Sequence, residues 1–563
     1  MKKIVCFLLS CILITACNDD KDVPQIPMNS IDEGFKSYLL EYFDLNNDGS
    51  ISVEEAALVT KIDASGRSVY SLEGIEFFPN LEILHCSSNP VESIDVSKNV
   101  KLKLLACDRS SIKEIDVSNN HELDTLYLRE NPSLNSLKIN PELKKIDMTF
   151  HSFSILDFKG HQHLKELFCR GTNLIYLDVS RSNLEILECE SNKGIETLNL
   201  EGCANLKKIT CIMGSGKSLN LNDCRNLEEL NVANAYSLNL KNCPLLKTLN
   251  CSNSQNDELD LTNNPALTDF TLFRSPIEHL ILTNNPALAN FSINETGIKK
   301  ADFGDNMNFV NFEMLNSSFY HGLDLSNCKT LKSFSVNYTH VRSEPKFDAI
   351  NLSGCTSLEN VLINRTHVKS LNLKGCSSIE LLDCSGNALT ELDVEDCSKL
   401  KELYCNNNNL TLLKANANIS VINCGGNYLT ELKLNEFSKL KKINCSYNDI
   451  SSLDFSGCLS LETLWSYDNK NLEELNVKDC KSLKDLYITN GQLTSLDITN
   501  CTELTLLNVR QNKLQPSLDI SKNTALSSLD CRDNSLLKEL KVKRNNTIQV
   551  LDKDSETQIV LVD

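Results

Sequence analysis

The sequence predicts a solenoid of short parallel β-strands, mainly β, with about 21 residues in each turn and a small helix–loop–helix module in front of it. Three observations predict this fold. Apolar–polar–apolar triplets recur from about residue 72 almost to the end of the 563-residue chain. The triplets form two interleaved series, each with a period near 21 residues. Many of the 24 cysteines stand at that same interval.

Residues 1–16 have the features of an export signal. Lys2 and Lys3 form a charged region, and Ile4–Ile14 is an apolar stretch too short to span a bilayer comfortably. The sequence Ile14-Thr15-Ala16-Cys17 resembles the lipobox of bacterial lipoproteins, in which the cysteine becomes the lipidated first residue. The alternative is an ordinary cleaved signal followed by an unrelated cysteine.

Residues 17–29 are predicted to form a flexible tether. The acidic run Asn18–Asp22 resembles the surface-export tag of Bacteroidetes lipoproteins. This resemblance implies an outer membrane lipoprotein, exposed on the cell surface, that contacts the membrane only through its N-terminal lipid.

Residues 30–70 are predicted to form the helix–loop–helix module. Ser30 and Glu33 match a capping box, so we expect a helix to begin there. The loop that follows matches the calcium-loop pattern D-x-[DN]-x-[DN]-G-x5-E at every position. Its expected metal ligands are oxygen atoms, which a hard cation requires. They belong to Asp44, Asn46, Asp48, Ser50 (through its carbonyl), Ser52 and Glu55.

This loop resembles those of EF-hands and dockerins, although a dockerin normally has two such loops and the sequence contains no second one. The resemblance implies one Ca²⁺ site, with the weak affinity of extracytoplasmic modules and a structural role at the start of the solenoid. The alternative is a solvated acidic turn that binds no metal.

Residues 71–545 are predicted to form the solenoid, and residues 546–563 its C-terminal cap. The unit Leu81-x-x-Leu84-x-Cys86-x-x-Asn89-x-Val91 resembles the leucine-rich repeat, L-x-x-L-x-L-x-x-N/C-x-L. Together with the second series, in which Leu392-Asp-Val394 is typical, the repeat is similar to those of Bacteroides-type surface lipoproteins and, more distantly, internalins. A three-residue strand cannot bury its inner face alone, so successive turns must stack.

The cysteines occupy two positions of the repeat. Some lie at the inward site that Leu or Val fills elsewhere and act as small apolar core residues: Cys86, Cys107, Cys169, Cys211, Cys251, Cys384, Cys405, Cys424, Cys445 and Cys531. Others fill a second slot: Cys203, Cys224, Cys243, Cys328, Cys355, Cys376, Cys397, Cys458, Cys480 and Cys501. That slot holds Asn in other turns, namely Asn99, Asn120, Asn264, Asn285 and Asn523.

We expect these cysteines to be stacked free thiols. An exported protein permits disulfides, which are the alternative. Side chains of neighbouring turns would be parallel, however, and this geometry suits an S–S bond poorly. The absence of any C-x-x-C pair from the sequence argues against zinc.

The cysteine-containing series is favoured as the concave face, because its outward positions vary more. The second series carries Asp or Asn in most turns, which indicates a turn-stabilising ladder. In the first series, the middle residue of each triplet and the residue after the triplet should face solvent. Late turns place the predicted ligand-binding residues there: Tyr404, Trp465, Tyr467, Tyr487 and Arg510. An earlier, thinner cluster consists of Tyr127, Arg129, Phe168 and Arg170.

Charge and motifs restrict the function. The formal net charge of −19 argues against nucleic acid as a partner, since a sequence-independent binder needs a basic face. No nucleophile elbow, phosphate loop or zinc-helix motif occurs. His161 and His163 form a close pair without a third metal ligand in the sequence. We therefore expect no catalytic residues and a protein that is not an enzyme.

These observations predict a monomeric, lipid-anchored surface protein that presents a repeat sheet to a protein partner in adhesion or recognition. Aromatic residues accompanied by arginines suit a protein partner, whereas aromatics alone suit a sugar. The alternatives are a glycan-binding accessory lipoprotein of a polysaccharide-handling system and a passive spacer with scattered surface aromatics.

Overall fold

The computed structural model describes residues 24–171, 173–190, 194–317, 322–339 and 348–563. These residues form two compact units. Unit 1 comprises the described residues up to Ser154 together with His161–Asn173, and unit 2 comprises Ile155–Gly160 and Leu174–Asp563. The predicted export signal and the predicted lipidation site Cys17 lie outside the described residues.

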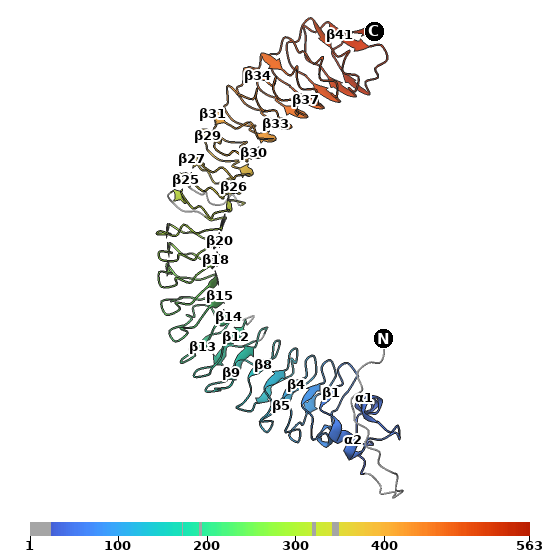
Figure 1. Ribbon diagram of the computed structural model, residues 1–563, viewed down its shortest axis with the longest axis vertical. Helices are drawn as coiled ribbons and strands as arrows, with labels where there is room; N and C mark the ends of the chain where they lie inside the picture. The colour runs from blue at the N-terminus through green and yellow to red at the C-terminus, as the bar shows by residue number, and fades with distance from the viewer. Residues whose placement is uncertain (1–23, 172, 191–193, 318–321, 340–347) are drawn as a thin grey trace, which may run out of the picture. The chain divides into compact units, whose positions relative to one another are not determined.

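Unit 1 begins with the helix–loop–helix module, in which α1 spans Glu33–Phe43 and α2 spans Val53–Leu58 (Figure 1). The apolar face of α1 buries Phe35 and Leu39 completely. The Tyr38 hydroxyl accepts the amide hydrogen of Asp63 at 2.8 Å, which ties α1 to the first strand of the solenoid. A short 3₁₀ helix, η1 (Ile75–Phe77), follows.

The predicted start of α1 is wrong. The N-cap residue is Asp32 rather than Ser30, and its carboxylate accepts the amide hydrogens of Gly34 and Phe35. A carboxylate at this position satisfies two free amides of the first turn and complements the positive end of the helix dipole. The Ser30 hydroxyl instead donates to the carbonyl of Pro27.

In unit 1 the first series forms one parallel sheet, the major sheet of unit 1. Consecutive strands pair in register, so that Leu84, Leu105 and Leu126 lie opposite one another. Its strands are β1 (Lys61–Asp63), β2 (Ile83–His85), β4 (Leu104–Ala106), β6 (Thr125–Tyr127), β8 (Lys145–Asp147) and β10 (Glu166–Phe168). The second series forms a minor sheet of β3 (Ser93–Ile94), β5 (Glu114–Asp116) and β7 (Ser136–Lys138).

In unit 2 the first series again forms an uninterrupted parallel sheet, the major sheet of unit 2. Within this unit it follows the inner side of the curve, as the sequence analysis favours (Figure 1). Its strands are β12 (Ile186–Cys189), β14 (Lys208–Ile212), β15 (Glu229–Ala233), β16 (Thr248–Ser252), β18 (Asp269–Phe273), β20 (Asn290–Asn294), β22 (Asn311–Leu315), β24 (Ser333–Asn337), β26 (Asn360–Asn364), β28 (Leu381–Asp383), β30 (Glu402–Tyr404), β32 (Val421–Asn423), β33 (Lys442–Asn444), β35 (Thr463–Trp465), β37 (Asp485–Tyr487), β38 (Leu506–Asn508), β40 (Ser528–Asp530) and β42 (Val550–Asp552).

The second series of unit 2 forms several short minor sheets, all parallel. They consist of β9 (Ile155–Asp157), β11 (Tyr176–Asp178) and β13 (Thr197–Asn199); β17 (Glu258–Asp260), β19 (His279–Ile281) and β21 (Lys300–Asp302); β23 (Leu323–Asp324), β25 (Ala349–Asn351) and β27 (Ser370–Asn372); β29 (Glu391–Asp393) and β31 (Leu412–Lys414); β34 (Ser452–Asp454) and β36 (Glu474–Asn476); and β39 (Ser517–Asp519), β41 (Glu539–Lys543) and β43 (Gln558–Val562).

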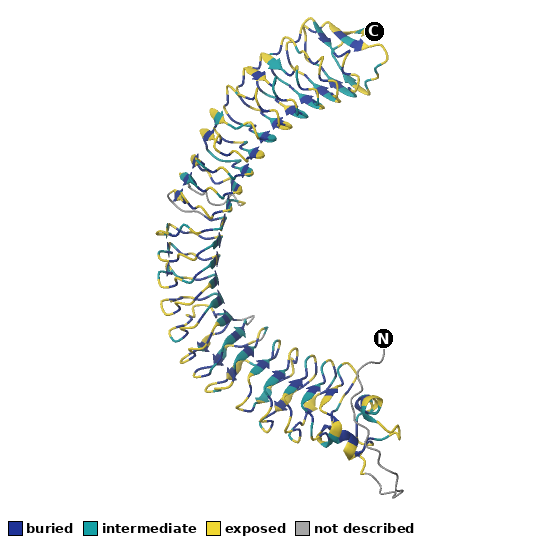
Figure 2. Ribbon diagram, in the orientation of Figure 1, coloured by how far each residue is buried: buried dark blue, intermediate teal, exposed yellow. Residues whose placement is uncertain are grey.

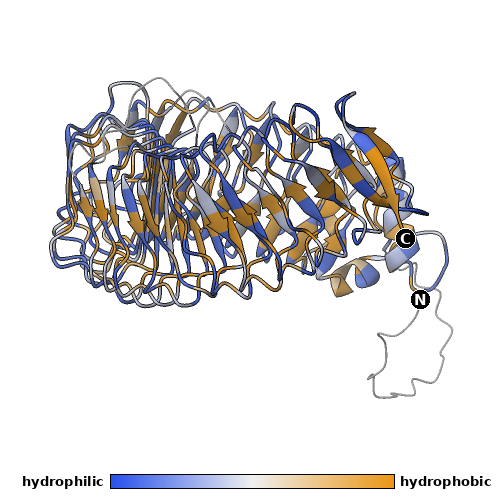
Figure 3. Cartoon of the chain, turned by 90° about the horizontal axis from the view of Figure 1, so that it is seen from above, coloured by the Kyte–Doolittle hydropathy of each residue, from blue (hydrophilic) through white to orange (hydrophobic). Residues whose placement is uncertain are grey.

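Apolar side chains fill the space between the major and minor sheets of each unit. Figure 2 shows buried residues alternating with intermediate and exposed ones around each turn, and Figure 3 shows hydrophobic residues on the strands. Leu84 and Leu105 are fully buried, as is the Leu or Ile at the same site of most other turns. Each such side chain contributes about 1.5–3 kcal/mol of hydrophobic stabilisation.

All 21 cysteines of the described residues are buried and free. The prediction of stacked free thiols is confirmed for these residues, and the disulfide alternative is wrong there. The Sγ atoms of Cys86 and Cys107 in adjacent turns lie 3.0 Å apart and form a thiol hydrogen bond. Burial raises the pKa of Cys107 well above its ordinary value, which keeps this thiol protonated.

Asn and Cys at the second slot donate to the same place in the preceding turn. The Asn120 side-chain amide donates to the Val96 carbonyl at 2.8 Å, and the Cys203 thiol donates to the Val179 carbonyl at 3.1 Å. The two residues of each pair are 24 positions apart. The predicted equivalence of Asn and Cys is therefore confirmed.

Asparagine at this slot buries a side-chain oxygen that cysteine does not have. The side-chain carbonyl oxygens of several slot asparagines are buried without a hydrogen-bond partner among the described residues: Asn99, Asn120, Asn264, Asn285 and Asn523. A buried acceptor without a partner destabilises the fold. A cysteine retains the donor and carries no such oxygen.

Sequence analysis missed a column of phenylalanines in the middle of unit 2. Phe270, Phe291, Phe312 and Phe334 replace the core Leu in successive turns, with ring centroids 5.6, 4.6 and 5.4 Å apart. The major-sheet strands from β14 to β26, which include those of this column, are five residues long instead of the expected three. Alternation in sequences such as Asp269–Phe273 extends over five residues and explains the longer pairing.

Candidate functional site

Two aromatic side chains face each other across neighbouring strands of the major sheet of unit 2. Trp465 ends β35 and Tyr487 ends β37, and the two residues are in register. Their ring centroids are 6.4 Å apart and their planes meet at 81°, an edge-to-face contact. Trp465, the one tryptophan of the chain, is 42% exposed. The predicted proximity of these two residues is confirmed.

A second aromatic pair lies beside the first. Tyr467 follows Trp465 after one buried residue, Ser466, and therefore also points outward. Its ring contacts that of Tyr447 in the neighbouring turn, with centroids 5.2 Å apart and planes at 89°. We call Tyr447, Trp465, Tyr467 and Tyr487 the aromatic cluster.

Backbone hydrogen bonds between the turns fix the aromatic cluster. The amide of Ser466 donates to the Tyr487 carbonyl at 2.8 Å, and the amide of Tyr447 donates to the Tyr467 carbonyl at 2.9 Å. The cluster thus sits on a stacked sheet whose residues lose little further freedom when a partner binds. Burial raises the pKa of Tyr487 above its ordinary value, so its hydroxyl remains neutral.

The other two predicted ligand-binding residues are engaged elsewhere. Tyr404 lies three strands away from Trp465 in the register, and its hydroxyl donates to the Glu402 carboxylate at 3.0 Å. Arg510 follows β38, and its guanidinium bonds the Asp533 carboxylate at 2.7 Å. The structure therefore gathers three of the five predicted residues into the aromatic cluster.

Tyr447 is the member of the cluster that sequence analysis missed. It stands three residues after Asn444, in a turn where the preceding repeat has Gly426. Both residues have positive φ, 53° for Tyr447 and 68° for Gly426. A tyrosine in this left-handed conformation is less stable than a glycine. The chain therefore carries an exposed aromatic ring here at a cost in backbone stability.

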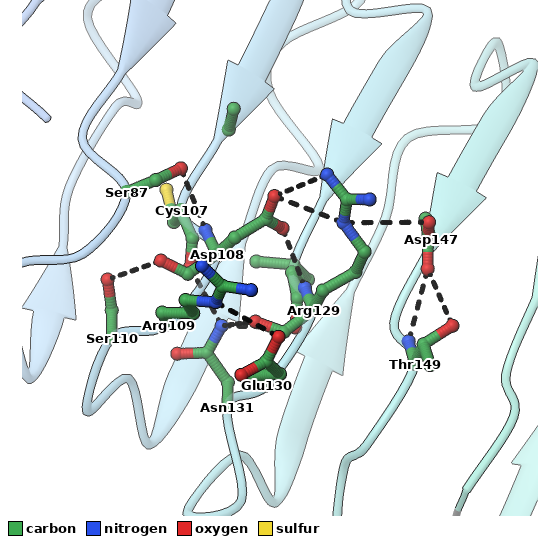
Figure 4. Close-up of polar contacts among 12 residues, drawn as sticks. Ser87, Cys107, Asp108, Arg109, Ser110, Arg129, Glu130, Asn131, Asp147 and Thr149 are labelled. Atoms are coloured by element: carbon green, nitrogen blue, oxygen red, sulfur yellow. Dashed lines mark hydrogen bonds and ion pairs between the residues drawn. The ribbon is translucent and has the colours of Figure 1, made fainter.

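The earlier cluster in unit 1 is a network of ion pairs. Arg129 bonds the Asp108 carboxylate at 2.8 Å and lies 3.7 Å from that of Asp147 (Figure 4). Its guanidinium also lies over the ring of Tyr127, 5.5 Å from the centroid. Lys145 contacts the ring of Phe168 at 5.1 Å. These charges stabilise one another along the sheet, and the Arg129 side chain remains 50% exposed.

Asp44 organises the first half of the predicted calcium loop. Its carboxylate accepts the amide hydrogens of Asp48 at 3.1 Å and Gly49 at 2.9 Å. Gly49 has φ +85°, which a sharp turn at this point requires. The Ser50 hydroxyl donates to the Asp48 carboxylate, and this hydrogen bond lowers the pKa of Asp48.

Glu55 joins the second half of the loop to the first. One carboxylate oxygen accepts the amide and hydroxyl hydrogens of Ser52, both at 2.9 Å, in a capping box at the start of α2. The other accepts the amide hydrogens of Leu45 at 2.9 Å and Asn46 at 3.3 Å. The hydrogen bond from the Ser52 amide lowers the pKa of Glu55, which keeps the carboxylate ionised at neutral pH.

The loop residues fit a hard cation in donor type and in order along the chain. Every predicted ligand is an oxygen atom. Among the described residues, no group of three or more His, Cys, Asp or Glu side chains is close enough together to hold a metal ion. Asp44 and Glu55 bond loop amides here, so a bound ion would have to draw their carboxylates together.

The chain resembles known proteins only at the level of solved structures. No family model and no curated protein matches it. Among solved structures, the functional domain of InlJ from Listeria monocytogenes, which includes a cysteine ladder, is 20% identical, with 92% of this chain and 78% of that chain covered and a TM-score of 0.30. YopM from Yersinia enterocolitica is 15% identical, with 93% and 94% covered and a TM-score of 0.40. A leucine-rich repeat protein from Leptospira interrogans is 14% identical, with 84% and 95% covered and a TM-score of 0.35.

The fold is a leucine-rich repeat solenoid. The in-register ladders of both units and the spacing of 21 residues between opposite leucines, as between Leu84 and Leu105, establish this from the chain itself. The similarities to the solved structures are low, and the proposals below rest on this chain's own residues. Among the described residues, none of the helices has the length and apolar character needed to cross a membrane.

In this leucine-rich repeat solenoid, the Asp residues of the second series stabilise turns, as predicted. The Asp116 carboxylate accepts the amide hydrogen of Ser118 at 3.1 Å and its hydroxyl hydrogen at 2.6 Å. Asp497 makes the same contacts with Thr499 at 3.1 and 2.7 Å. The pattern recurs in many turns, which makes these carboxylates structural groups rather than a ligand site.

Proposed function

We propose that this protein is a surface-anchored recognition protein that binds a protein partner through the aromatic cluster. The observation that carries the proposal is the set of four outward aromatic rings on adjacent turns of a hydrogen-bonded sheet. Tryptophan and tyrosine are enriched among the residues that dominate binding energy at protein interfaces. Two of the rings, Trp465 and Tyr447, are 42% and 57% exposed, so they are open to a partner.

Charged pairs beside the cluster support a protein partner. Arg510 pairs with Asp533 at 2.7 Å, and Arg532 pairs with Asp530 at 2.7 Å. Both arginines are less than half exposed, and both pairs follow strands on the C-terminal side of Tyr487. Such a polar border around an apolar centre is typical of protein interfaces.

A glycan-binding role in a polysaccharide-handling system is the second candidate. It is favoured by the observation that Arg510 is already paired with Asp533, which leaves the aromatic rings as the main unengaged groups. Sugar rings stack on aromatic faces without needing arginine. In either case the role is recognition, and we propose no catalytic residue.

The location and the metal are part of the proposal. The sequence before and around Cys17 supports lipid anchoring at the outer membrane, with the solenoid exposed on the cell surface. One structural Ca²⁺ site at the N-terminal end of unit 1 is supported by the oxygen donors of Asp44, Asn46, Asp48, Ser50 (through its carbonyl), Ser52 and Glu55. Loss of lipid labelling in Cys17→Ala would test the anchor.

Site-specific photo-crosslinking tests the binding surface even while the partner is unidentified. A benzophenone amino acid replaces Tyr487 in the full chain, and matched controls carry it at Leu412 of minor-sheet strand β31, which is 39% exposed. In cells that produce the protein, we expect a discrete protein adduct from position 487 and none of that mass from position 412. Equal adducts from both positions would contradict the proposal, and a saccharide adduct would favour the second candidate.

A further inference from the structure

A hollow lies at the edge of the major sheet of unit 2, where β30, β32 and β33 begin. Its volume is about 700 Å³. It is lined by polar and charged residues only: Glu380, Ser398, Lys399, Lys401, Asn418, Ser420, Lys439, Lys441 and Ser460. We call it the lysine recess. None of these residues belongs to the aromatic cluster.

A short turn of the solenoid lies at the recess, and the turn from Leu137 to Ile146 in unit 1 is shortened to the same length. From the core leucine of the minor series to that of the major series, the chain takes 11 positions between Leu392 and Leu403 and again between Leu432 and Ile443. In the turn between them, Leu413 and Ile422 are 9 positions apart. Asn418 and Ser420, small residues of this short connection, line the floor of the recess.

Lysines from the two longer turns lie on either side of this floor. The Ser420 amide donates to the Lys401 carbonyl and the Lys441 amide to the Ser420 carbonyl, both at 2.8 Å, so these three residues lie side by side just before consecutive strands. Lys401 and Lys441 are therefore about 10 Å apart along the sheet edge, two strand spacings. Lys399 and Lys439 flank Asn418 in the same way, and the Lys439 ammonium donates to the Asn418 side-chain oxygen at 2.8 Å.

Charge in the recess is unbalanced. Four lysines face one carboxylate, that of Glu380, which pairs with Lys401 at 2.7 Å. Lys441 has no carboxylate within ion-pair distance among the residues that the structure describes. The hydrogen bond from Lys401, and to a smaller extent the charge of nearby Lys399, lower the pKa of Glu380. A concentrated positive site on a chain of net charge −19 attracts anions locally, although the molecule as a whole repels them.

We propose that the lysine recess binds an acidic oligosaccharide, one that carries sulfate or carboxylate groups. Lysine ammonium groups bind such groups as point charges. The Ser420 hydroxyl donates to the Lys401 carbonyl at 2.9 Å and the Ser398 hydroxyl to the Ser377 carbonyl at 3.4 Å, so both oxygens can still accept a hydrogen bond from a sugar hydroxyl. Apart from the aliphatic stems of the lysines, the lining offers no apolar side chain, and it has no aromatic ring on which a nucleobase could stack. This proposal does not depend on whether the aromatic cluster binds a protein.

Calorimetric titration of the full chain tests this site. The probes are a heparin octasaccharide and an oligogalacturonate of equal length, which separate sulfate from carboxylate. Their controls are a neutral, desulfated and carboxyl-reduced octasaccharide and a glutamate octapeptide. At about 50 mM salt, where exposed charges are weakly screened, we expect one acidic saccharide to bind and the neutral one not to bind.

Matched variants locate the binding. Lys399→Gln with Lys441→Gln should weaken saccharide binding about tenfold, the loss expected for two charge contacts. Lys399→Arg with Lys441→Arg should retain it. Lys332→Gln with Lys374→Gln removes two exposed lysines outside the recess and should change the affinity less than twofold. Thermal midpoints of all variants should stay equal, because these side chains are exposed.

Several outcomes would overturn the proposal. Equal losses in the recess and control variants would show that the charge alone, and not the recess, attracts the saccharide. Tighter binding of the glutamate octapeptide with the same variant dependence would assign the recess to an acidic protein. Absence of binding by both acidic saccharides would remove the site. Trp465→Ala with Tyr487→Ala must leave saccharide binding unchanged, which separates this test from that of the aromatic cluster.

Discussion

Trp465 and Tyr487 lie opposite each other on neighbouring parallel strands, with ring centroids 6.4 Å apart and planes at 81°. Parallel register brings the ends of β35 and β37 together, so that two residues 22 positions apart in the chain form one surface. Because the tryptophan is unique in the chain, its fluorescence reports on this surface alone.

The positive φ of Tyr447 predicts a trade between stability and binding. Tyr447→Gly should stabilise the fold by about 1 kcal/mol, because glycine adopts φ near +53° without steric cost. The same change should weaken partner binding, since one ring of the cluster is lost. Urea unfolding measures the first effect. Tyr428→Gly is the control, because Tyr428 is similarly exposed and is not among the residues with positive φ. A gain of equal size in both variants would contradict the explanation.

The two kinds of interior asparagine should respond differently to cysteine. The Asn264 side-chain oxygen has no partner among the described residues, so Asn264→Cys should change the free energy of unfolding by less than about 1 kcal/mol. The Asn427 side-chain oxygen accepts the Leu410 amide hydrogen at 3.0 Å. Asn427→Cys leaves the Leu410 amide without an acceptor and should lower the free energy of unfolding by about 1–3 kcal/mol. Equal effects in chemical denaturation would show that the oxygen is irrelevant.

Calcium should stabilise the N-terminal module. At about 10 mM Ca²⁺ and a dissociation constant of about 0.5 mM, binding adds about 2 kcal/mol relative to a chelator. Differential scanning calorimetry would detect this gain. Glu55→Gln should abolish it while retaining the capping box, since glutamine also serves at that position. Glu54→Gln, at the exposed neighbouring residue, should keep it. A calcium response that survives Glu55→Gln would place the ion elsewhere.

Asp116 should contribute to acid sensitivity. The Ser118 hydroxyl, and then Lys138, lower the pKa of Asp116 to about 2. Because this lies below the unfolded value of about 3.9, the stabilisation is present above pH ~4 and disappears as the pH falls through the folded-state pKa. The stability difference between wild type and Asp116→Asn in urea should therefore shrink below pH ~4. A difference that stays constant with pH would exclude this carboxylate as a contributor.

Much of the solenoid could be predicted from the sequence, because each core site repeats a chemical type. Leu84 and Leu105 recur in one ladder, and Cys86 and Cys107 stack beside them as free thiols. The outward direction of Trp465 and Tyr487 followed from strand alternation alone. These features depend on local alternation and period, which a single sequence displays.

Other features depend on distances between side chains, or on competition between neighbouring residues for one role, and the repeat pattern contains neither. The N-cap of α1 is Asp32 because its carboxylate reaches two amides, whereas the capping-box pattern indicated Ser30. Tyr447 belongs to the cluster through a turn residue, which the triplet alignment did not cover. Counting from each triplet into the following turn would have found Tyr447, and counting the positions between Leu413 and Ile422 would have found the short turn.

Trp465 fluorescence during titration with the crosslinked partner tests the central claim most directly. At saturation we predict a blue shift of the emission and protection from iodide quenching, because the ring is 42% exposed in the free protein and leaves water in the complex. Tyr487→Ala, which removes the edge contact of the ring, should weaken the binding by about 1 kcal/mol or more. Saturated binding with unchanged emission and unchanged quenching would contradict the assignment of the aromatic cluster as the recognition surface.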